Sequence, residues 1–182
     1  MKVLQSVNEA RIHLDAGSVL AYPTESMYGL GCDPWNTGAL EELLEIKGRA
    51  KKKGLIVLIA EWAQLWPLID NVHESYLERV RRTWPGPVTW IFPKSAKVPE
   101  LLSGDYSSIA IRMTAHRLAH DLCCNGPIVS TSANRTGSVP ARSINELQEQ
   151  FPTQLELVLA GDIGTSTAPS SIYDVLTGLQ LR

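Results

Sequence analysis

The chain has 182 residues, of which 44% are hydrophobic and 20% are charged, and its formal net charge is -2. These values are typical of a globular protein with one sizeable core, and the slightly acidic balance excludes a generally basic nucleic-acid coat protein. Any anion-binding surface must therefore come from a local patch of basic residues.

The three cysteines, Cys32, Cys123 and Cys124, have no spacing typical of a secreted disulfide framework. They form no CxxC pair and the four histidines are scattered, so the sequence fits no zinc-binding pattern. The first residues become polar too quickly for a signal peptide, and no apolar run is long enough to span a bilayer. We therefore expect a cytoplasmic protein without a membrane segment.

Helix and strand signals alternate along the first half of the chain. Residues 6–9 (SVNE) have the form of a capping box, which opens a helix that Gly17 can end. We expect a buried strand at 19–22 and then a polar, glycine-containing loop as far as Pro34. The further elements, in chain order, are a helix capped by Asn36 or Thr37 and closed by Gly48, a strand at 55–59, and weaker helices at 62–66 and 74–82.

The second half of the chain contains mostly short strand signals, several of which follow turns or polar stretches. In chain order we expect a turn at 84–87, strands at 88–92 and 108–113, a helix at 116–123, a strand at 128–130, a second capping box at 143–146, and strands at 155–159, 171–175 and 179–181. Without a repeat or a clear linker, this alternation predicts one α/β domain over residues 1–182. Its sheet is expected to be twisted and mixed, with parallel and antiparallel strands and flanking helices.

The loop at 22–31 (YPTESMYGLG) is the first candidate for a functional site. It follows a buried strand, and ligands of open α/β sheets bind at the carboxyl ends of strands. Its hydroxyl groups can bind a ligand, and its glycines let the backbone approach one closely. Since it contains neither a GxxxxGK[ST] nor a GxGxxG pattern, an ordinary connection between two elements is an equal alternative.

The segment 47–54 (KGRAKKKG) carries five positive charges within seven residues, between a predicted helix and a predicted strand. A bound polyanion would relieve the repulsion among them, with Arg49 gripping phosphate through two hydrogen bonds and the lysines acting as point charges. One alternative is a solvated basic turn that glutamates of the preceding helix partly balance. The other is a patch that faces RNA.

Hydroxyl and amide side chains gather in residues 130–134 (STSAN), after a predicted strand, where they can hold an anion or simply cap a turn. A weaker hydroxyl-rich signal lies at 168–174 (APSSIYD). Arg112 sits among apolar neighbours in another predicted strand and needs a partner if it is buried. That partner is either a protein carboxylate, which is the more common outcome, or the carboxylate of a ligand. His116 is expected to cap the following helix.

Taken together, these segments resemble the YrdC-like family of threonylcarbamoyl-AMP synthases almost end to end. The motifs that carry the resemblance are YPTE and YGLG within 22–31, KGR and KGL within 47–55, WPGPVT at 84–89, Arg112 with His116, STSAN with Gly137, and PSSIYD at 169–174. The length resembles the short bacterial form, without the extra C-terminal domain of longer relatives.

The resemblance implies a twisted α/β fold around a positively charged concave pocket. It also implies a reaction in which L-threonine, bicarbonate and ATP, with Mg²⁺ on the phosphates, give threonylcarbamoyl-AMP and pyrophosphate. The product would supply the threonylcarbamoyl group for adenosine 37 of tRNAs that read codons starting with A. The bacterial tRNA threonylcarbamoyl transfer complex would complete this second step. One alternative is a non-catalytic protein that binds double-stranded RNA, rRNA or tRNA through the same surface. The other is the carbamoyl-adenylate chemistry of hydrogenase maturation, which the absence of zinc-finger and acylphosphatase segments disfavours.

The resemblance also assigns roles to individual residues. The residues that it places at ATP are Lys47 and Arg49, as catalytic phosphate ligands, with Lys53, Ser132, Asn134 and Arg182. The residues that it places at threonine are Thr24, Tyr28, Thr131, Ser170 and Arg112, the last of which pairs with the substrate carboxylate. No residue is expected to be a dedicated metal ligand. Longer relatives carry a histidine near threonine in the strand after the basic segment, whereas residues 55–59 (LIVLI) contain none, so we expect the threonine contacts to differ in this form.

Overall fold

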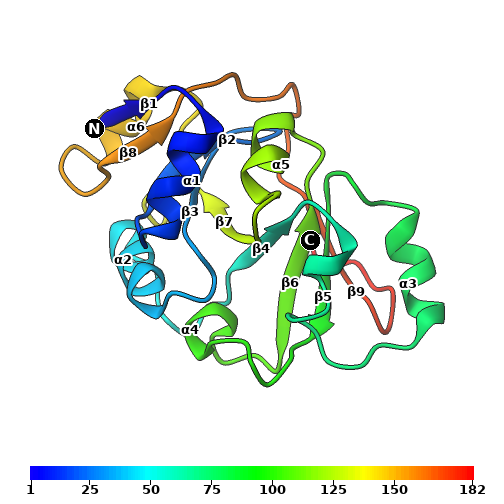
Figure 1. Ribbon diagram of the computed structural model, residues 1–182. Helices are drawn as coiled ribbons and strands as arrows, with labels where there is room; N and C mark the ends of the chain where they lie inside the picture. The colour runs from blue at the N-terminus through cyan, green and yellow to red at the C-terminus, as the bar shows by residue number, and fades with distance from the viewer.

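The computed structural model describes residues 1–182 and contains one sheet of nine strands with helices packed against it (Figure 1). The strands are β1 (Lys2–Leu4), β2 (Leu20–Pro23), β3 (Tyr28–Gly31), β4 (Ile56–Ile59), β5 (Val88–Pro93), β6 (Ser108–Met113), β7 (Ile128–Ser132), β8 (Leu157–Leu159) and β9 (Ser171–Asp174). Their order in the sheet is β1-β8-β2-β3-β7-β4-β6-β5-β9. Parallel and antiparallel neighbours both occur, so the predicted α/β class with a mixed sheet is confirmed.

Apart from α4, which was not predicted, the helices begin and end largely where the sequence predicts. They are α1 (Val7–Asp15), α2 (Thr37–Lys47), α3 (Glu74–Arg81), α4 (Glu100–Ser103), α5 (Arg117–Cys123) and α6 (Ile144–Gln150), with one 3-10 turn, η1 (Trp62–Gln64). Ser6, Asn36 and His116 each accept a hydrogen bond from the backbone N–H three residues further on, which caps α1, α2 and α5. Gly48 ends α2 with a φ of 59°, a left-handed conformation that favours glycine.

Buried apolar side chains attach helices to both faces of the sheet. Helices α1 and α5 pack in a cluster of 12 buried residues that includes Leu58 of β4. Helices α2, α3, α4 and α6 contribute to a larger cluster of 34 buried residues, which includes Val57 and Ile59 of the same strand. Since successive side chains of a strand point to opposite faces, β4 is covered on both sides. The continuous apolar run at 55–59 is typical of such a strand.

The prediction of a loop as far as Pro34 is wrong for strand β3. Residues Tyr28–Gly31 pair antiparallel with β2 on one side and with β7 on the other. Two glycines in four residues are unfavourable for a strand judged by itself. A Cβ on Gly31 would lie only 2.5 Å from the Val129 carbonyl oxygen and 2.7 Å from the Tyr22 ring. The glycine therefore permits close packing inside the sheet and does not mark a turn.

Three shorter segments also differ from the prediction. Strand β1, which the sequence analysis does not identify, pairs in parallel with β8. Residues 62–66 form only the 3-10 turn η1, and residues 179–181 form no strand but a single bridge between Tyr173 and Gln180. These segments are so short that tertiary pairing decides their conformation. None of the helices combines the length and the apolar character that crossing a membrane requires.

Candidate active site

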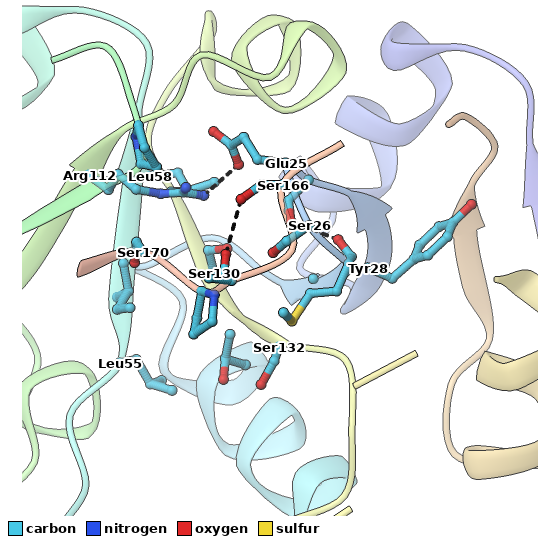
Figure 2. A pocket seen from close by; sticks show the side chains of 18 of the residues that line it. Glu25, Ser26, Tyr28, Leu55, Leu58, Arg112, Ser130, Ser132, Ser166 and Ser170 are labelled. Atoms are coloured by element: carbon cyan, nitrogen blue, oxygen red, sulfur yellow. Dashed lines mark hydrogen bonds and ion pairs between the residues drawn. The ribbon is translucent and has the colours of Figure 1, made fainter. Parts of the chain in front are cut away.

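A cavity lies over the middle of the sheet, where β3, β7, β4 and β6 are neighbours (Figure 2). It is built from segments that are far apart in the sequence, chiefly the β2–β3 connection, the residues around β4, the end of β7 and the C-terminal stretch. The lining residues are Thr24, Glu25, Ser26, Met27, Tyr28, Gly29, Arg49, Gly54, Leu55, Ile56, Leu58, Pro87, Arg112, Ser130, Thr131, Ser132, Ser166, Ala168, Pro169, Ser170 and Arg182. The structure thus brings all four candidate segments to one cavity and adds Arg112 from β6.

Four charged side chains line the cavity, namely Arg49, Arg112, Arg182 and Glu25. Arg112 and Glu25 form an ion pair with each other. Arg49 and Arg182 have no carboxylate partner within the chain. Two guanidinium groups without a protein counter-charge, surrounded by hydroxyl side chains, suit an anionic ligand.

Arg49 lines the cavity just after the left-handed residue that ends α2. Its Nη2 donates a hydrogen bond to the Gly54 carbonyl oxygen at 2.7 Å. Its Nε is buried and has no hydrogen-bond partner. Burial lowers the pKa of Arg49 from its ordinary value, yet a guanidinium stays charged at neutral pH. A buried donor without an acceptor is unfavourable, so a ligand oxygen at this place would satisfy a group that the protein leaves unpaired.

Lys47 does not line the cavity, although the sequence analysis places it at the phosphates together with Arg49. Its side chain belongs to the last turn of α2 and is buried, with 3% of the residue exposed. The ammonium donates to the carbonyl oxygens of Ser132 and Asn134 and to Oδ1 of Asn134. An ammonium has three donors, and all three are used here. In this structure Lys47 therefore stabilises the end of β7. Its ammonium is bonded to the backbone of Ser132 and does not line the cavity.

Burial, with a smaller contribution from Arg49, lowers the pKa of Lys47 from 10.5 to about 8, which gives the protein a pH-dependent stability. Between these two values the unfolded chain holds a proton at Lys47 that the folded chain has lost. Stability rises with pH wherever the unfolded state binds more protons, so Lys47 makes the free energy of unfolding increase across this window.

Urea unfolding of the wild type and of Lys47→Met measures this effect, because other groups that titrate contribute equally to both proteins. The free energy of unfolding of the wild type minus that of the variant should rise by about 1 kcal/mol per pH unit above pH ~8. A difference that stays constant up to pH ~10 would contradict the lowered pKa of Lys47.

Three other residues of the predicted ATP site, Ser132, Asn134 and Lys53, differ in whether they line the cavity. Ser132 lines the cavity, and its hydroxyl donates to Oδ1 of Asn134 at 2.6 Å. Asn134 does not line the cavity, because its amide nitrogen also donates to two backbone carbonyls of the following turn. The exposed Lys53 pairs through its backbone with Gly104 and does not line the cavity either. Asn134 thus orients Ser132, while Lys53 faces solvent.

Arg112 is buried in β6, and its partner is the carboxylate of Glu25 (Figure 2). Nη2 of Arg112 lies 2.9 Å from Oε2 of Glu25, while Oε1 accepts from Thr114 Oγ1 at 2.8 Å and from the Ala115 backbone N–H at 3.2 Å. Burial alone would raise the pKa of Glu25, but the charge of Arg112 and these hydrogen bonds hold it below its usual value. Of the two partners left open by the sequence, the protein carboxylate is therefore present. The other N–H groups of Arg112 make no hydrogen bond within the chain and remain available to a ligand.

The hydroxyl groups of the predicted threonine site differ in whether they already make a hydrogen bond within the chain. The side chain of Thr131 lines the cavity and makes no hydrogen bond within the chain, whereas Thr24 Oγ1 donates to the Met27 carbonyl oxygen at 2.7 Å. Tyr28 is among the lining residues, but its ring points away from the other labelled side chains and its hydroxyl donates to the Gly161 carbonyl oxygen at 2.9 Å (Figure 2). In this structure the Tyr28 hydroxyl therefore has a protein partner and is not directed toward a ligand in the cavity.

Arg182 and Ser170 form a connected pair at the C-terminal edge of the cavity. Nη2 of Arg182 donates to the Ser170 carbonyl oxygen at 2.9 Å, and the Ser170 hydroxyl lies 2.8 Å from the Thr89 hydroxyl. Burial and, to a smaller extent, the charge of Arg112 lower the pKa of Arg182. The structure thus brings the last residue of the chain to the cavity, as the resemblance implies. The ligand-binding roles of all these residues stay predictions.

Glu25 is the main cavity residue to which the sequence analysis gives no role. A signal was available, because a buried arginine requires a carboxylate and Glu25 lies within one of the candidate loops. Ser166 also lines the cavity and was not identified. Its backbone N–H donates to the Glu25 carbonyl oxygen at 3.0 Å, a long-range contact that the sequence does not indicate.

The fold and the cavity define a class: an α/β protein with a mixed sheet and an arginine- and hydroxyl-lined site over its central strands. The particular family follows from comparison with known sequences. The chain belongs to the Sua5/YciO/YrdC family, whose model, described as "Telomere recombination", matches residues 13–181.

Curated relatives resemble the chain over nearly its whole length. The threonylcarbamoyl-AMP synthase of Coxiella burnetii (strain RSA 493) is 46% identical over 180 residues, which cover 98% of this chain and 97% of that protein. The protein of the same name from Cellvibrio japonicus is 43% identical over 178 residues, which cover 97% of this chain and 94% of that protein. The family match at 13–181 includes every residue that lines the cavity except Arg182.

Solved structures agree with the fold. Sua5 of P. abyssi, crystallised with L-threonine, superposes with a TM-score of 0.89 at 29% identity, covering 99% of this chain and 56% of that chain. The chain thus spans about half the length of the Sua5 protein. E. coli YciO superposes with a TM-score of 0.80 at 22% identity, covering 94% of this chain and 87% of that chain, a likeness of fold alone.

Proposed function

We propose that the protein is a nucleotidyltransferase that makes threonylcarbamoyl-AMP from L-threonine, bicarbonate and ATP and releases pyrophosphate. The observation that carries the proposal is the 46% identity, over 98% of the chain, to a threonylcarbamoyl-AMP synthase. The cavity supports it, because Arg49 and Arg112 provide two cations for two anionic substrates in one site. The structure of a relative with bound L-threonine also supports an amino-acid substrate.

In the proposed reaction, the amine of threonine and bicarbonate form a carbamate with loss of water. A carbamate oxygen then attacks the α-phosphorus of ATP, and pyrophosphate leaves as the bond to its bridging oxygen breaks. Both reactants are anions, so the site must offset their repulsion. In this proposal Arg112 binds the threonine carboxylate, Arg49 and Arg182 bind phosphate oxygens, and neutral hydroxyls such as that of Thr131 orient the carbamate. Positioning and electrostatics then account for the rate without a covalent nucleophile.

Mg²⁺ is part of this proposal as a companion of ATP. The only carboxylate that lines the cavity is Glu25, and both of its oxygens already accept hydrogen bonds from the protein. The lining therefore offers Mg²⁺ no free acidic ligand. Since Mg²⁺ is readily held by phosphate oxygens and water, we propose that it enters as MgATP without a dedicated protein site.

We further propose that the product supplies the threonylcarbamoyl group for adenosine 37 of tRNAs that read codons starting with A. Partner proteins of the bacterial tRNA threonylcarbamoyl transfer complex would use it, and a cytoplasmic location would suit this step. The alternative of a non-catalytic RNA-binding protein is not favoured, since RNA binding does not require the cavity. In the basic segment 47–54, Lys51 pairs with Glu41, and in a further basic stretch at 79–82, Arg81 pairs with Glu74.

The test of the proposed function is formation of the adenylate by the full-length protein. The protein is incubated with α-labelled ATP, Mg²⁺ and bicarbonate, with and without L-threonine, and both the adenylate and pyrophosphate are measured. We expect both products only when threonine and bicarbonate are present. L-Valine is the matched control, because it replaces the threonine hydroxyl with a methyl group of similar size. If no threonine-dependent adenylate forms, the proposed function is wrong.

A further inference from the structure

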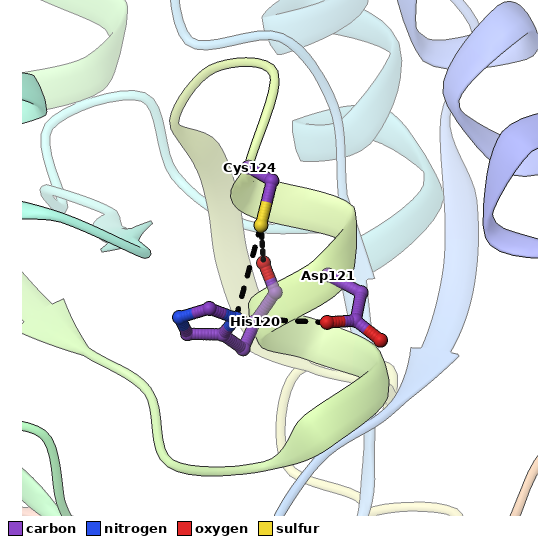
Figure 3. Close-up of side chains that lie close together, drawn as sticks. All are labelled: His120, Asp121 and Cys124. Carbon is purple, nitrogen blue, oxygen red and sulfur yellow. Dashed lines mark hydrogen bonds and ion pairs between the residues drawn. The ribbon is translucent and has the colours of Figure 1, made fainter.

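Three side chains of types that bind metals lie together at the C-terminal end of α5 (Figure 3). They are His120, Asp121 and Cys124, and one ligand atom from each lies within 4.8 Å of the others. Nδ1 of His120 is 3.8 Å from Sγ of Cys124 and 3.6 Å from Oδ1 of Asp121. None of the three lines the cavity, so the cluster is separate from the candidate active site.

Helical spacing explains why the donor atoms meet. His120 and Cys124 are four residues apart, a separation that places two side chains on the same face of a helix, one turn apart. Bonds of ~2.0 Å to nitrogen and ~2.3 Å to sulfur at a tetrahedral angle place these two atoms ~3.5 Å apart. The nitrogen–sulfur separation of 3.8 Å is therefore only slightly longer than the ~3.5 Å expected when zinc is bound.

The surroundings leave the cluster open to an ion. Cys124 is the exposed one of the three cysteines, and its Sγ has only the His120 carbonyl oxygen, at 3.5 Å, as a further contact. Asp121 has one cationic neighbour, Arg117, at 4.0 Å. The Arg117 side chain is 93% exposed, so this contact is weak and easily given up. Arg11 also donates to carbonyls at this helix end, and its charge opposes a bound cation to a small degree.

We propose that His120, Asp121 and Cys124 bind a zinc ion at the surface, with water or a group from another molecule in the fourth position. Imidazole nitrogen, thiolate sulfur and carboxylate oxygen are all ligands of Zn²⁺, whereas Mg²⁺ prefers oxygen alone. The thiol of Cys124 loses its proton when it binds the metal. No CxxC pair marks this cluster in the sequence, because its histidine and cysteine are spaced by one helical turn.

Cobalt(II) provides a direct spectroscopic test on the full-length, reduced protein. The titration is done without ATP, which itself binds divalent cations. We expect a thiolate-to-cobalt charge-transfer band, and this band reports on Cys124 because Cys32 and Cys123 are buried. Zn²⁺ should displace the cobalt and abolish the band. Cys124→Ser should remove the band, and His120→Ala should weaken Zn²⁺ binding by about tenfold or more.

The control is His13→Ala, which removes a histidine of α1 outside the cluster and should leave the band and the affinity unchanged. A second readout is alkylation of Cys124, which Zn²⁺ should slow in the wild type but not in His120→Ala. The proposal is overturned if cobalt gives no thiolate band, or if Zn²⁺ binds the wild type, Cys124→Ser and His120→Ala equally well. Adenylate formation does not depend on this outcome, so failure here leaves the proposed function unaffected.

Discussion

Replacing Arg49 with alanine is expected to lower kcat/KM for MgATP by about 100-fold or more. The guanidinium lines the cavity, and its buried Nε has no acceptor within the protein. In the proposed complex a phosphate oxygen supplies that acceptor, and the interaction strengthens as charge develops on the departing pyrophosphate. The only hydrogen bond lost within the protein is that to Gly54, so the free energy of unfolding should change by no more than ~1.5 kcal/mol. Steady-state adenylate formation at varied MgATP measures the first effect, and urea unfolding measures the second.

Two control variants separate the role of Arg49 from a general effect of positive charge. Lys53→Ala removes the same charge from the same segment, but Lys53 is exposed and outside the cavity. Because solvent and salt screen its charge, we expect a loss of less than about threefold. Arg49→Lys keeps the charge but not the planar fork, and we expect an intermediate loss of about tenfold. Equal losses for Lys53→Ala and Arg49→Ala would mean that Arg49 has no specific contact with ATP.

Local signals predicted the longer helices well, because a helix end is decided by neighbouring residues. Ser6 and Asn36 cap α1 and α2 with hydrogen bonds that span only three residues, and Gly48 ends α2 where a left-handed conformation is needed. Strand β3 could not be predicted in the same way. Its pairing with β7 joins residues about one hundred positions apart, and only glycine fits at position 31 because the Val129 carbonyl oxygen approaches so closely.

In the candidate site, the direction of single side chains could not be predicted from the sequence either. The sequence placed Lys47 and Arg49 together as phosphate ligands, since they are two residues apart in a basic segment. Gly48 between them turns the backbone into the left-handed region, so Lys47 faces the interior and Arg49 faces the cavity. Residue types and spacing therefore indicated an anion site, but the direction of each side chain depended on the path of the backbone.

Replacing Arg112 with glutamine is expected to have a large effect on both threonine binding and stability. The side chains of Arg112 and Glu25 are 10% and 17% exposed, and removal of one partner leaves the other charge buried without its counter-charge. Breaking a buried pair in this way costs about 3–5 kcal/mol of the free energy of unfolding. The substitution also removes the proposed partner of the threonine carboxylate, and we expect KM for threonine to rise by about 100-fold. Urea unfolding and adenylate formation at varied threonine measure the two effects.

The double variant Glu25→Gln/Arg112→Gln separates stability from binding. With no unpaired charge left, most of the lost stability should return, while KM for threonine should stay as high as in Arg112→Gln. Glu25→Gln alone keeps the cation, and its amide oxygen can still accept from Thr114, so we expect a smaller rise in KM of about tenfold. Equal rises in KM for Glu25→Gln and Arg112→Gln would show that Arg112 acts by holding the loop of Glu25 rather than by contacting threonine. A larger rise for Arg112→Gln, retained in the stable double variant, assigns the contact to the arginine itself.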